Sequence, residues 1–174
     1  MNKLGSISLA EAVKLKSVLN KRIQELEHEM RRVAFTTIEK GEEPKIGPRT
    51  LENVTAELDQ VRLDNRTLDK LMYRANIDHT IEFQDETLAI VEAIELATQL
   101  RAKAQLYKEF AAAEQEEIQY GYADTTTVYR VALFDPEEYR LKAIEVEKQA
   151  HKLSNLINAK NYSITLPFDD ENYF

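Results

Sequence analysis

The three histidines are the residues of this 174-residue chain best suited to metal chemistry, because the chain has no cysteine. Glu25 and His28 form a Glu-x-x-His sequence, the spacing with which four-helix di-iron proteins aim two ligands at one metal ion. Such sites need a second motif of this kind, but His151 has Lys148 at the corresponding position, and His79 lies outside the helical pattern. We therefore interpret Glu25 and His28 as part of a solvated helix face, and we expect no bound metal and no cofactor.

Sequence patterns of known catalytic sites are also missing. The sequence contains no glycine-rich phosphate loop and no Gly-x-Ser-x-Gly motif. Helical periodicity brings no pair of carboxylates together, and the acidic run EQEEI, residues 114–118, is typical of a solvated helix end. The sequence therefore predicts a protein that is not an enzyme and has no catalytic residues.

Tyrosine and arginine are concentrated between residues 120 and 140. Both residue types are typical of binding hot spots. The six that could form an interaction surface are Tyr120, Tyr122, Tyr129, Arg130, Tyr139 and Arg140. The same side chains could instead pack a β-ribbon onto the helices, and this structural interpretation is the one we favour.

Four long segments with apolar residues at spacings of three and four must position these groups. The capping box Ser8-Leu9-Ala10-Glu11 predicts a helix from residue 8 to about 38, and a second helix covers about 50–76. A third covers about 86–119, and Asp135 followed by Pro136 predicts the start of the fourth. The predicted fold class is mainly α: an antiparallel long-helix bundle of about four helices with coiled-coil-like packing.

Two segments between the helices have no helical period. Residues 119–134, QYGYADTTTVYRVALF, are rich in threonine, valine and tyrosine, and their alternation predicts a short strand or hairpin between helices three and four. Residues 77–83, IDHTIEF, contain β-branched residues, and we interpret them as a connector.

One amide interrupts the apolar seam of the second helix. The seam consists of Leu51, Val54, Leu58, Val61, Asn65, Leu68, Met72 and Ala75. A buried Asn65 would fix the register or the oligomeric state by pairing across the seam, at a cost in stability. Alternatively, the helix turns Asn65 toward solvent, and the amide is only hydrated.

Composition restricts location and partners. The net charge is -8, which disfavours nucleic acid and anionic membrane surfaces as partners. No segment approaches eighteen consecutive apolar residues, and the first residues lack the apolar core of a signal peptide, so we expect a soluble, cytoplasmic protein without a membrane span. The length predicts a single helical-bundle domain over residues 1–166, followed by an acidic flexible tail over residues 167–174.

The lengths of the predicted helices point to self-association. Helices of about thirty residues span about 45 Å, which is long for a monomer of this size. The longer helices, one and three, would extend beyond their neighbours with apolar residues uncovered, and an edge strand at residues 124–133 could pair with a second copy. We therefore expect a homo-oligomer, a dimer or a higher even oligomer.

Three segments carry a resemblance to a known family. They are SLAEAVKLKSVLNKRIQEL, RANIDHTIEFQDETLAIVEAIELATQLRAK and VEKQAHKLSNLINAKNYSITL, the last containing Asn161-Tyr162-Ser163. Over residues 8–166 the chain resembles the small bacterial helical family often labelled septicolysin, a domain of unknown function. The resemblance implies a helical core with a small β element and brings no activity.

Three functions remain open at this point. The leading one is a non-enzymatic helical bundle that self-associates and binds an unidentified macromolecular partner, a protein. A membrane-active or pore-forming toxin is what the septicolysin label implies. A protein that binds a small ligand, a nucleotide or metabolite, through the tyrosine- and arginine-rich region is the third.

Overall fold

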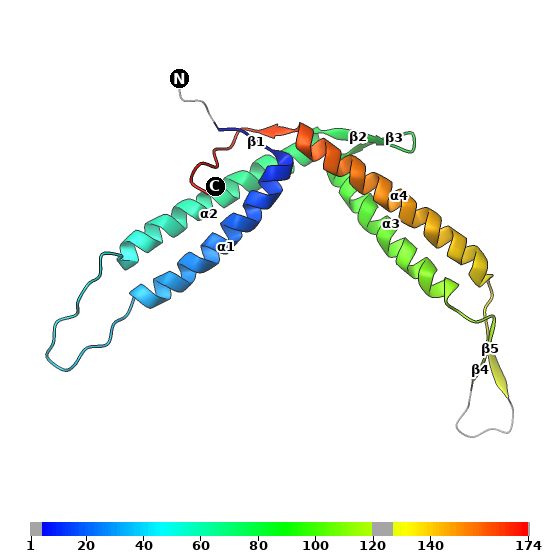
Figure 1. Ribbon diagram of the computed structural model, residues 1–174, viewed down its shortest axis with the longest axis horizontal. Helices are drawn as coiled ribbons and strands as arrows, with labels where there is room; N and C mark the ends of the chain where they lie inside the picture. Colours follow the sequence, from blue (N-terminus) through cyan, green and yellow to red (C-terminus); the bar gives the residue numbers. More distant parts are fainter. Residues whose placement is uncertain (1–4, 120–126, 174) are drawn as a thin grey trace. The chain divides into compact units, whose positions relative to one another are not determined.

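The computed structural model describes residues 5–119 and 127–173, and within these ranges the fold is mainly α, as predicted. Its four helices are α1 (Leu9–Val33), α2 (Leu51–Asp78), α3 (Ile90–Ala111) and α4 (Pro136–Ser163) (Figure 1). Six short strands form three separate antiparallel pairs, and the pair between α3 and α4 is the predicted hairpin.

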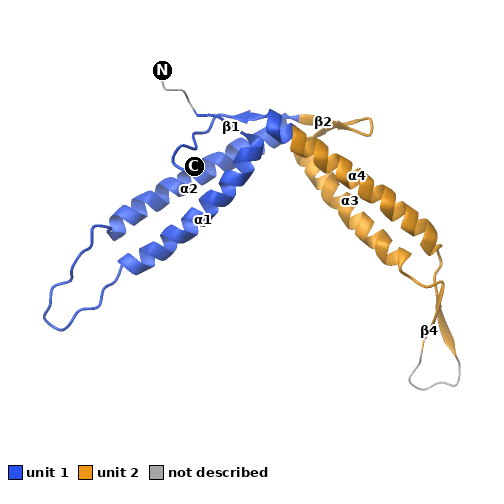
Figure 2. Cartoon of the chain, viewed as in Figure 1, with its two compact units in different colours: residues 1–79, 160–174 blue, residues 80–159 orange. Residues whose placement is uncertain are grey.

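The chain divides into two compact units, shown in different colours in Figure 2. Unit 1 consists of Met1–His79 and Lys160–Phe174, and unit 2 consists of Thr80–Ala159. Each unit contains one pair of neighbouring helices. The single domain expected over residues 1–166 stays a prediction.

In unit 1, α1 and α2 pack as an antiparallel pair with a leucine-rich seam. The direction follows from the cross-helix contacts, because Lys16 pairs with Asp69, whereas Arg22, further along α1, pairs with Glu57, which lies earlier on α2. Ser8 and Thr50 cap the two helices, each in a capping box, and the predicted starts are confirmed. The fully or nearly fully buried seam residues include Leu15, Leu19, Leu26, Val54, Leu58 and Leu68.

The segment after α4 belongs to unit 1 and packs against the rest of that unit. Strand β6 (Thr165–Leu166) pairs with β1 (Ile7–Ser8), and Phe168 is buried. The Tyr173 hydroxyl donates a hydrogen bond of 2.5 Å to Asp64 on α2. Two aromatic side chains, Phe168 and Tyr173, thus hold residues 167–173 against unit 1, and the flexibility expected of this acidic tail stays a prediction.

In unit 2, α3 and α4 meet along a seam rich in alanine, to which α4 also contributes Val146, Leu153 and Ile157. Ala93, Ala97 and Ala104 on α3, and Ala143 and Ala150 on α4, are buried. The antiparallel direction again follows from side-chain contacts: Arg101 donates to Ser154, and Lys108 pairs with Glu147.

Two predicted helix boundaries are wrong at α3. Residues 80–89 form a hairpin of β2 (Thr80–Phe83) and β3 (Glu86–Ala89), rather than a connector and the first turn of the helix. At the other end α3 stops at Ala111, because Glu116–Gln119 form β4. The first helix also ends early, at Val33. The expectation of longer helices one and three, and of apolar stripes extending beyond their neighbours, therefore has no basis.

The β2–β3 hairpin escaped sequence analysis because its turn lacks glycine. Gln84 and Asp85 both have positive φ angles, 50° and 65°, as in the tight turns that usually contain Asn-Gly. Ile81 and Phe83 are buried, whereas the intervening Glu82 is exposed, and this alternation fixes which side of the hairpin faces the core.

We expect Asp85→Gly to raise the free energy of unfolding by about 0.5–1 kcal/mol, because glycine adopts a positive φ angle without steric cost. Chemical denaturation of the variant beside the parent protein measures the change. Glu86→Gly, one residue later in β3, is the control and should lower stability. A destabilised Asp85→Gly protein would contradict the turn geometry.

Candidate interaction surface

Four of the six residues predicted to form an interaction surface are described by the structure, and they lie on two different elements. Tyr120 and Tyr122 lie outside the described residues. Tyr129 and Arg130 belong to β5 (Val128–Val131), where all four residues are exposed. Tyr139 and Arg140 belong to the first turns of α4.

Tyr139 packs inside an aromatic cluster of unit 2 formed by Tyr107, Phe110, Phe134 and Tyr139. Its ring centroid lies 5.1 Å from those of Tyr107 and Phe134, and 5.3 Å from that of Phe110. These near-perpendicular arrangements are the favourable edge-to-face geometry. The neighbouring Arg140 is held by Glu137 at 2.6–3.0 Å, and this contact raises the pKa of Arg140. Tyr139 therefore packs in the way that the structural interpretation expects. It attaches the base of the hairpin between α3 and α4 to the helices.

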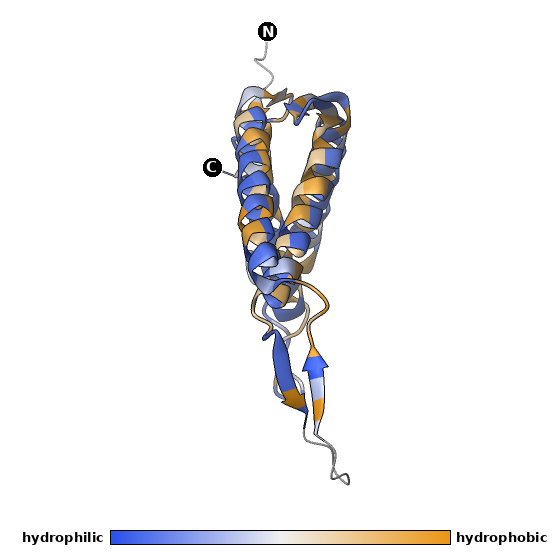
Figure 3. Ribbon diagram, turned by 90° about the vertical axis from the view of Figure 1, so that its right-hand side faces the viewer, coloured by the Kyte–Doolittle hydropathy of each residue, from blue (hydrophilic) through white to orange (hydrophobic). Residues whose placement is uncertain are grey.

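The β4–β5 hairpin, which we call the ribbon, has two chemically different faces. Residues directly opposite each other share a face, so Ile118 and Tyr129 lie together with Val131 and Glu116. The other face carries Glu117, Arg130, Gln119 and Val128, and Arg130 lies 3.8 Å from Glu117. Figure 3 shows this mixture of hydrophobic and hydrophilic residues along the two strands.

The apolar face of the ribbon is not covered by the rest of the described chain. Ile118, Tyr129 and Val131 are 46%, 52% and 47% exposed. A two-stranded ribbon is marginal in water by itself, and exposed apolar side chains that lie together mark interaction sites. The ribbon face of Ile118, Tyr129 and Val131 is therefore our candidate interaction surface.

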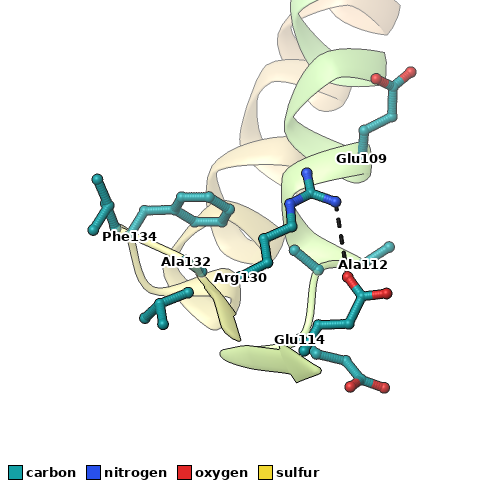
Figure 4. A pocket seen from close by; sticks show the side chains of 10 residues that line it. Glu109, Ala112, Glu114, Arg130, Ala132 and Phe134 are labelled. Atoms are coloured by element: carbon teal, nitrogen blue, oxygen red, sulfur yellow. Dashed lines mark ion pairs between the residues drawn. The ribbon is translucent and has the colours of Figure 1, made fainter. Parts of the chain in front are cut away.

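A hollow of about 680 Å³ lies at the base of the ribbon. Its lining includes Arg130, Phe134 and three carboxylates, those of Glu109, Glu114 and Glu117. Figure 4 shows Arg130 beside the hollow, with its ion pair to a glutamate marked. With three acidic side chains and one basic side chain, the lining repels anions such as nucleotides.

Asn65 takes part in the seam of unit 1. Its amide nitrogen donates to the side-chain oxygen of Asn20 on α1 at 3.2 Å. Its own oxygen is buried and has no hydrogen-bond partner among the described residues. The pairing across the α1–α2 seam is what the register interpretation expects, although the role of Asn65 in register or assembly stays a prediction.

Sequence reasoning missed an ionic network at the loop end of the α1–α2 pair. Arg49 binds Glu29 at 3.1 Å and Glu57 at 2.5 Å, and Glu57 also accepts a bond from Arg22. Hydrogen bonds from Arg49 and then Arg22 hold the pKa of Glu57 below its usual value. Arg49 lies in a loop, so helical periodicity gave no signal for it.

The described residues contain no cluster of three or more side chains suited to binding a metal ion. Glu25 of the Glu-x-x-His sequence instead lies beside Arg22 and Lys21. In the part of the chain that the structure describes, none of the helices combines the length and the apolar character needed to cross a membrane.

These features define a mainly α protein with an exposed β-ribbon, and comparison places it in a family. The chain belongs to the family of unknown function DUF6847, whose model matches residues 16–166. That match does not bear on the septicolysin resemblance, which stays a prediction. No curated protein matches the chain.

One solved structure shares the fold. It is the crystal structure of a functionally unknown conserved protein from Corynebacterium diphtheriae, with a TM-score of 0.63 and 22% sequence identity. The similarity covers 93% of this chain and 99% of that chain. At this identity the likeness shows the fold alone.

We expect Asn65→Leu to raise the free energy of unfolding by about 1 kcal/mol, because it removes a buried acceptor that lacks a partner. Asn65→Asp should lower it, because a carboxylate is costlier to bury than an amide. Chemical denaturation measures both changes, and light scattering coupled to size exclusion shows whether Asn65→Leu mixes oligomeric states. Unchanged stability together with one unchanged species would rule out a register role.

The ionic network predicts a specific loss of stability in acid. The pKa of Glu57 is lowered in the folded state, so its contribution is present above the unfolded pKa of about 4.3 and is lost as the pH falls below it. We expect Glu57→Gln to flatten the decline in free energy of unfolding between about pH 5 and pH 3. Asp59→Asn, at an exposed position of the same helix, is the control and should leave the decline nearly unchanged.

Proposed function

We propose that this chain is a non-enzymatic helical protein that associates with copies of itself and binds a macromolecular partner. The supporting observation is the exposed apolar face of the ribbon, formed by Ile118, Tyr129 and Val131. Tyrosine at the centre of such a face is typical of a binding hot spot.

Self-association accounts for two features of the ribbon at once. The first feature is the apolar face, which is stabilised when another surface buries it from solvent. The second is that both strands of a two-stranded sheet are edge strands with unpaired backbone groups. Another ribbon of the same kind supplies apolar side chains and backbone hydrogen-bonding groups together. A small ligand in the hollow would leave the apolar face exposed.

A second apolar surface supports a macromolecular partner. The loop between α1 and α2, residues 34–50, carries Phe35 and Ile46, which are 84% and 83% exposed. Binding residues are often found on loops held by a rigid scaffold, and the helices on both sides of this loop are tied together by Arg49. The net charge of -8 favours a protein over nucleic acid as the partner. The lack of cysteine fits a cytoplasmic setting.

We expect the purified protein to show a mass above 20.1 kDa that increases with concentration in the micromolar range, measured by light scattering coupled to size exclusion. The double variant Ile118→Ser, Tyr129→Ser should associate at least tenfold more weakly, because it removes apolar area from the centre of the contact. Gln119→Ser alters the other face of the same ribbon, on β4, and is the matched control.

Two results would count against this proposal. The first is a mass near 20.1 kDa at every concentration up to about 100 μM, a range in which weak specific dimers are normally visible. The second is an equal loss of association in Gln119→Ser and in the double variant. Circular dichroism should show the same helix content in all three proteins, so that unfolding does not imitate a loss of contact.

A further inference from the structure

The free edge of β5 can be identified from one hydrogen bond. The Ala132 backbone N–H donates to the Gln115 carbonyl at 2.9 Å, in continuation of the β4–β5 pairing. Backbone groups of successive residues in a strand point to opposite sides. Arg130 and Val128 therefore point their N–H and C=O groups toward β4, whereas Tyr129 and Val131 present theirs at the free edge.

The two edges of the ribbon differ in charge. Strand β4 carries Glu116 and Glu117 and no basic residue, so two copies of β4 side by side would bring four carboxylates together. Acidic edge strands are a device by which proteins prevent such pairing. Strand β5 carries a single charge, on Arg130, between tyrosine and valine. The β5 edge is therefore the one suited to a second copy.

The apolar face restricts how two β5 strands can align. If both apolar faces are to lie on one side of a joint antiparallel sheet, residues of the same face must stand opposite each other. Two alignments meet this condition around the centre of β5. In the first alignment, Arg130 stands opposite Arg130 of the second copy, which places like charges in direct opposition. In the second, Tyr129 stands opposite Tyr129 of the second copy, and Arg130 stands opposite Val128.

We propose that two copies of the chain join through antiparallel pairing of their β5 edges, with Tyr129 at the two-fold axis. This inference rests on the proposed self-association and specifies its interface. The joint sheet has four strands, and one of its faces combines Ile118, Tyr129 and Val131 from both copies. An isologous contact of this kind closes at two copies, whereas pairing of β4 with β5 of another copy would continue as a ring or filament.

Cysteine cross-linking tests the position of the axis, because the chain has no cysteine of its own. At the axis, Tyr129→Cys places two sulfurs within reach of a disulfide, since opposed residues lie about 5.5 Å apart between Cα atoms. We expect most of this variant to form a covalent dimer under mild oxidation. Ile118→Cys, on the same face but on β4, and Val128→Cys, on the other face, should remain largely monomeric on a denaturing gel.

Charge variants of Val128 test the alignment while keeping Tyr129. In the proposed sheet residue 128 stands opposite Arg130 of the other copy, twice per interface. Val128→Glu should tighten association about fivefold and Val128→Lys should weaken it by a similar factor, as two cross-strand charge pairs of about 0.5 kcal/mol predict. Sedimentation equilibrium measures both dissociation constants, and raising the salt concentration should reduce the difference.

The outcomes separate this inference from the proposed function. If the parent protein associates but Ile118→Cys cross-links in place of Tyr129→Cys, then β4 is the contact strand and only the inference fails. If Tyr129→Cys cross-links but the two Val128 variants associate equally, the alignment is wrong. A parent protein that stays monomeric at every concentration rejects both proposals.

Discussion

Each helix of this protein has a single helical neighbour within its unit. Further apolar burial must therefore come from the segments outside the helices. A helix packed on one partner buries one stripe of side chains and leaves its other sides to solvent or to other segments. In unit 1 the stripe is rich in leucine, and in unit 2 the α3 side is mostly alanine, whereas α4 also buries Val146, Leu153 and Ile157. Alanine contributes little buried area, so unit 2 depends more on what packs at its ends.

Both units obtain additional apolar burial from short β elements and aromatic side chains. In unit 1 the pairing of β1 with β6 brings Ile7, Leu166 and Phe168 into the core. In unit 2 the β2–β3 hairpin buries Ile81 and Phe83, and the aromatic cluster closes the other end of the α3–α4 pair. The β-pairs are therefore parts of the cores of a mainly α protein. The ribbon is different, because all of the residues of β4 and β5 are exposed.

The helices were predictable from sequence because their signals are local. Capping residues such as Ser8 and Thr50 and the spacing of buried leucines specify where a helix begins and which side it buries. The β2–β3 hairpin was not predictable in the same way, because Gln84 and Asp85 adopt positive φ angles without the glycine that normally marks such a turn.

The sequence indicated part of the candidate surface and missed the rest. Tyr129 and Arg130 were recognisable by residue type, whereas Ile118 was assigned to a charged helix end because it follows EQEE. Its place on an apolar face depends on which residue of β5 stands opposite, and cross-strand register is not encoded in local periodicity. The contact between Asn65 and Asn20 and the ionic network of Arg49 likewise depend on how two distant segments pack.

The aromatic cluster connects the two interpretations of the tyrosine- and arginine-rich region. Phe134 follows β5 closely and Phe110 precedes β4, and both rings pack with Tyr139 on α4. The chain on both sides of the ribbon is thereby fixed to the helices. A strand that is held in place loses less conformational freedom on binding, so more of its interaction energy contributes to affinity. In the association that we propose, packing at Tyr139 would therefore reduce the conformational freedom that Tyr129 loses on pairing.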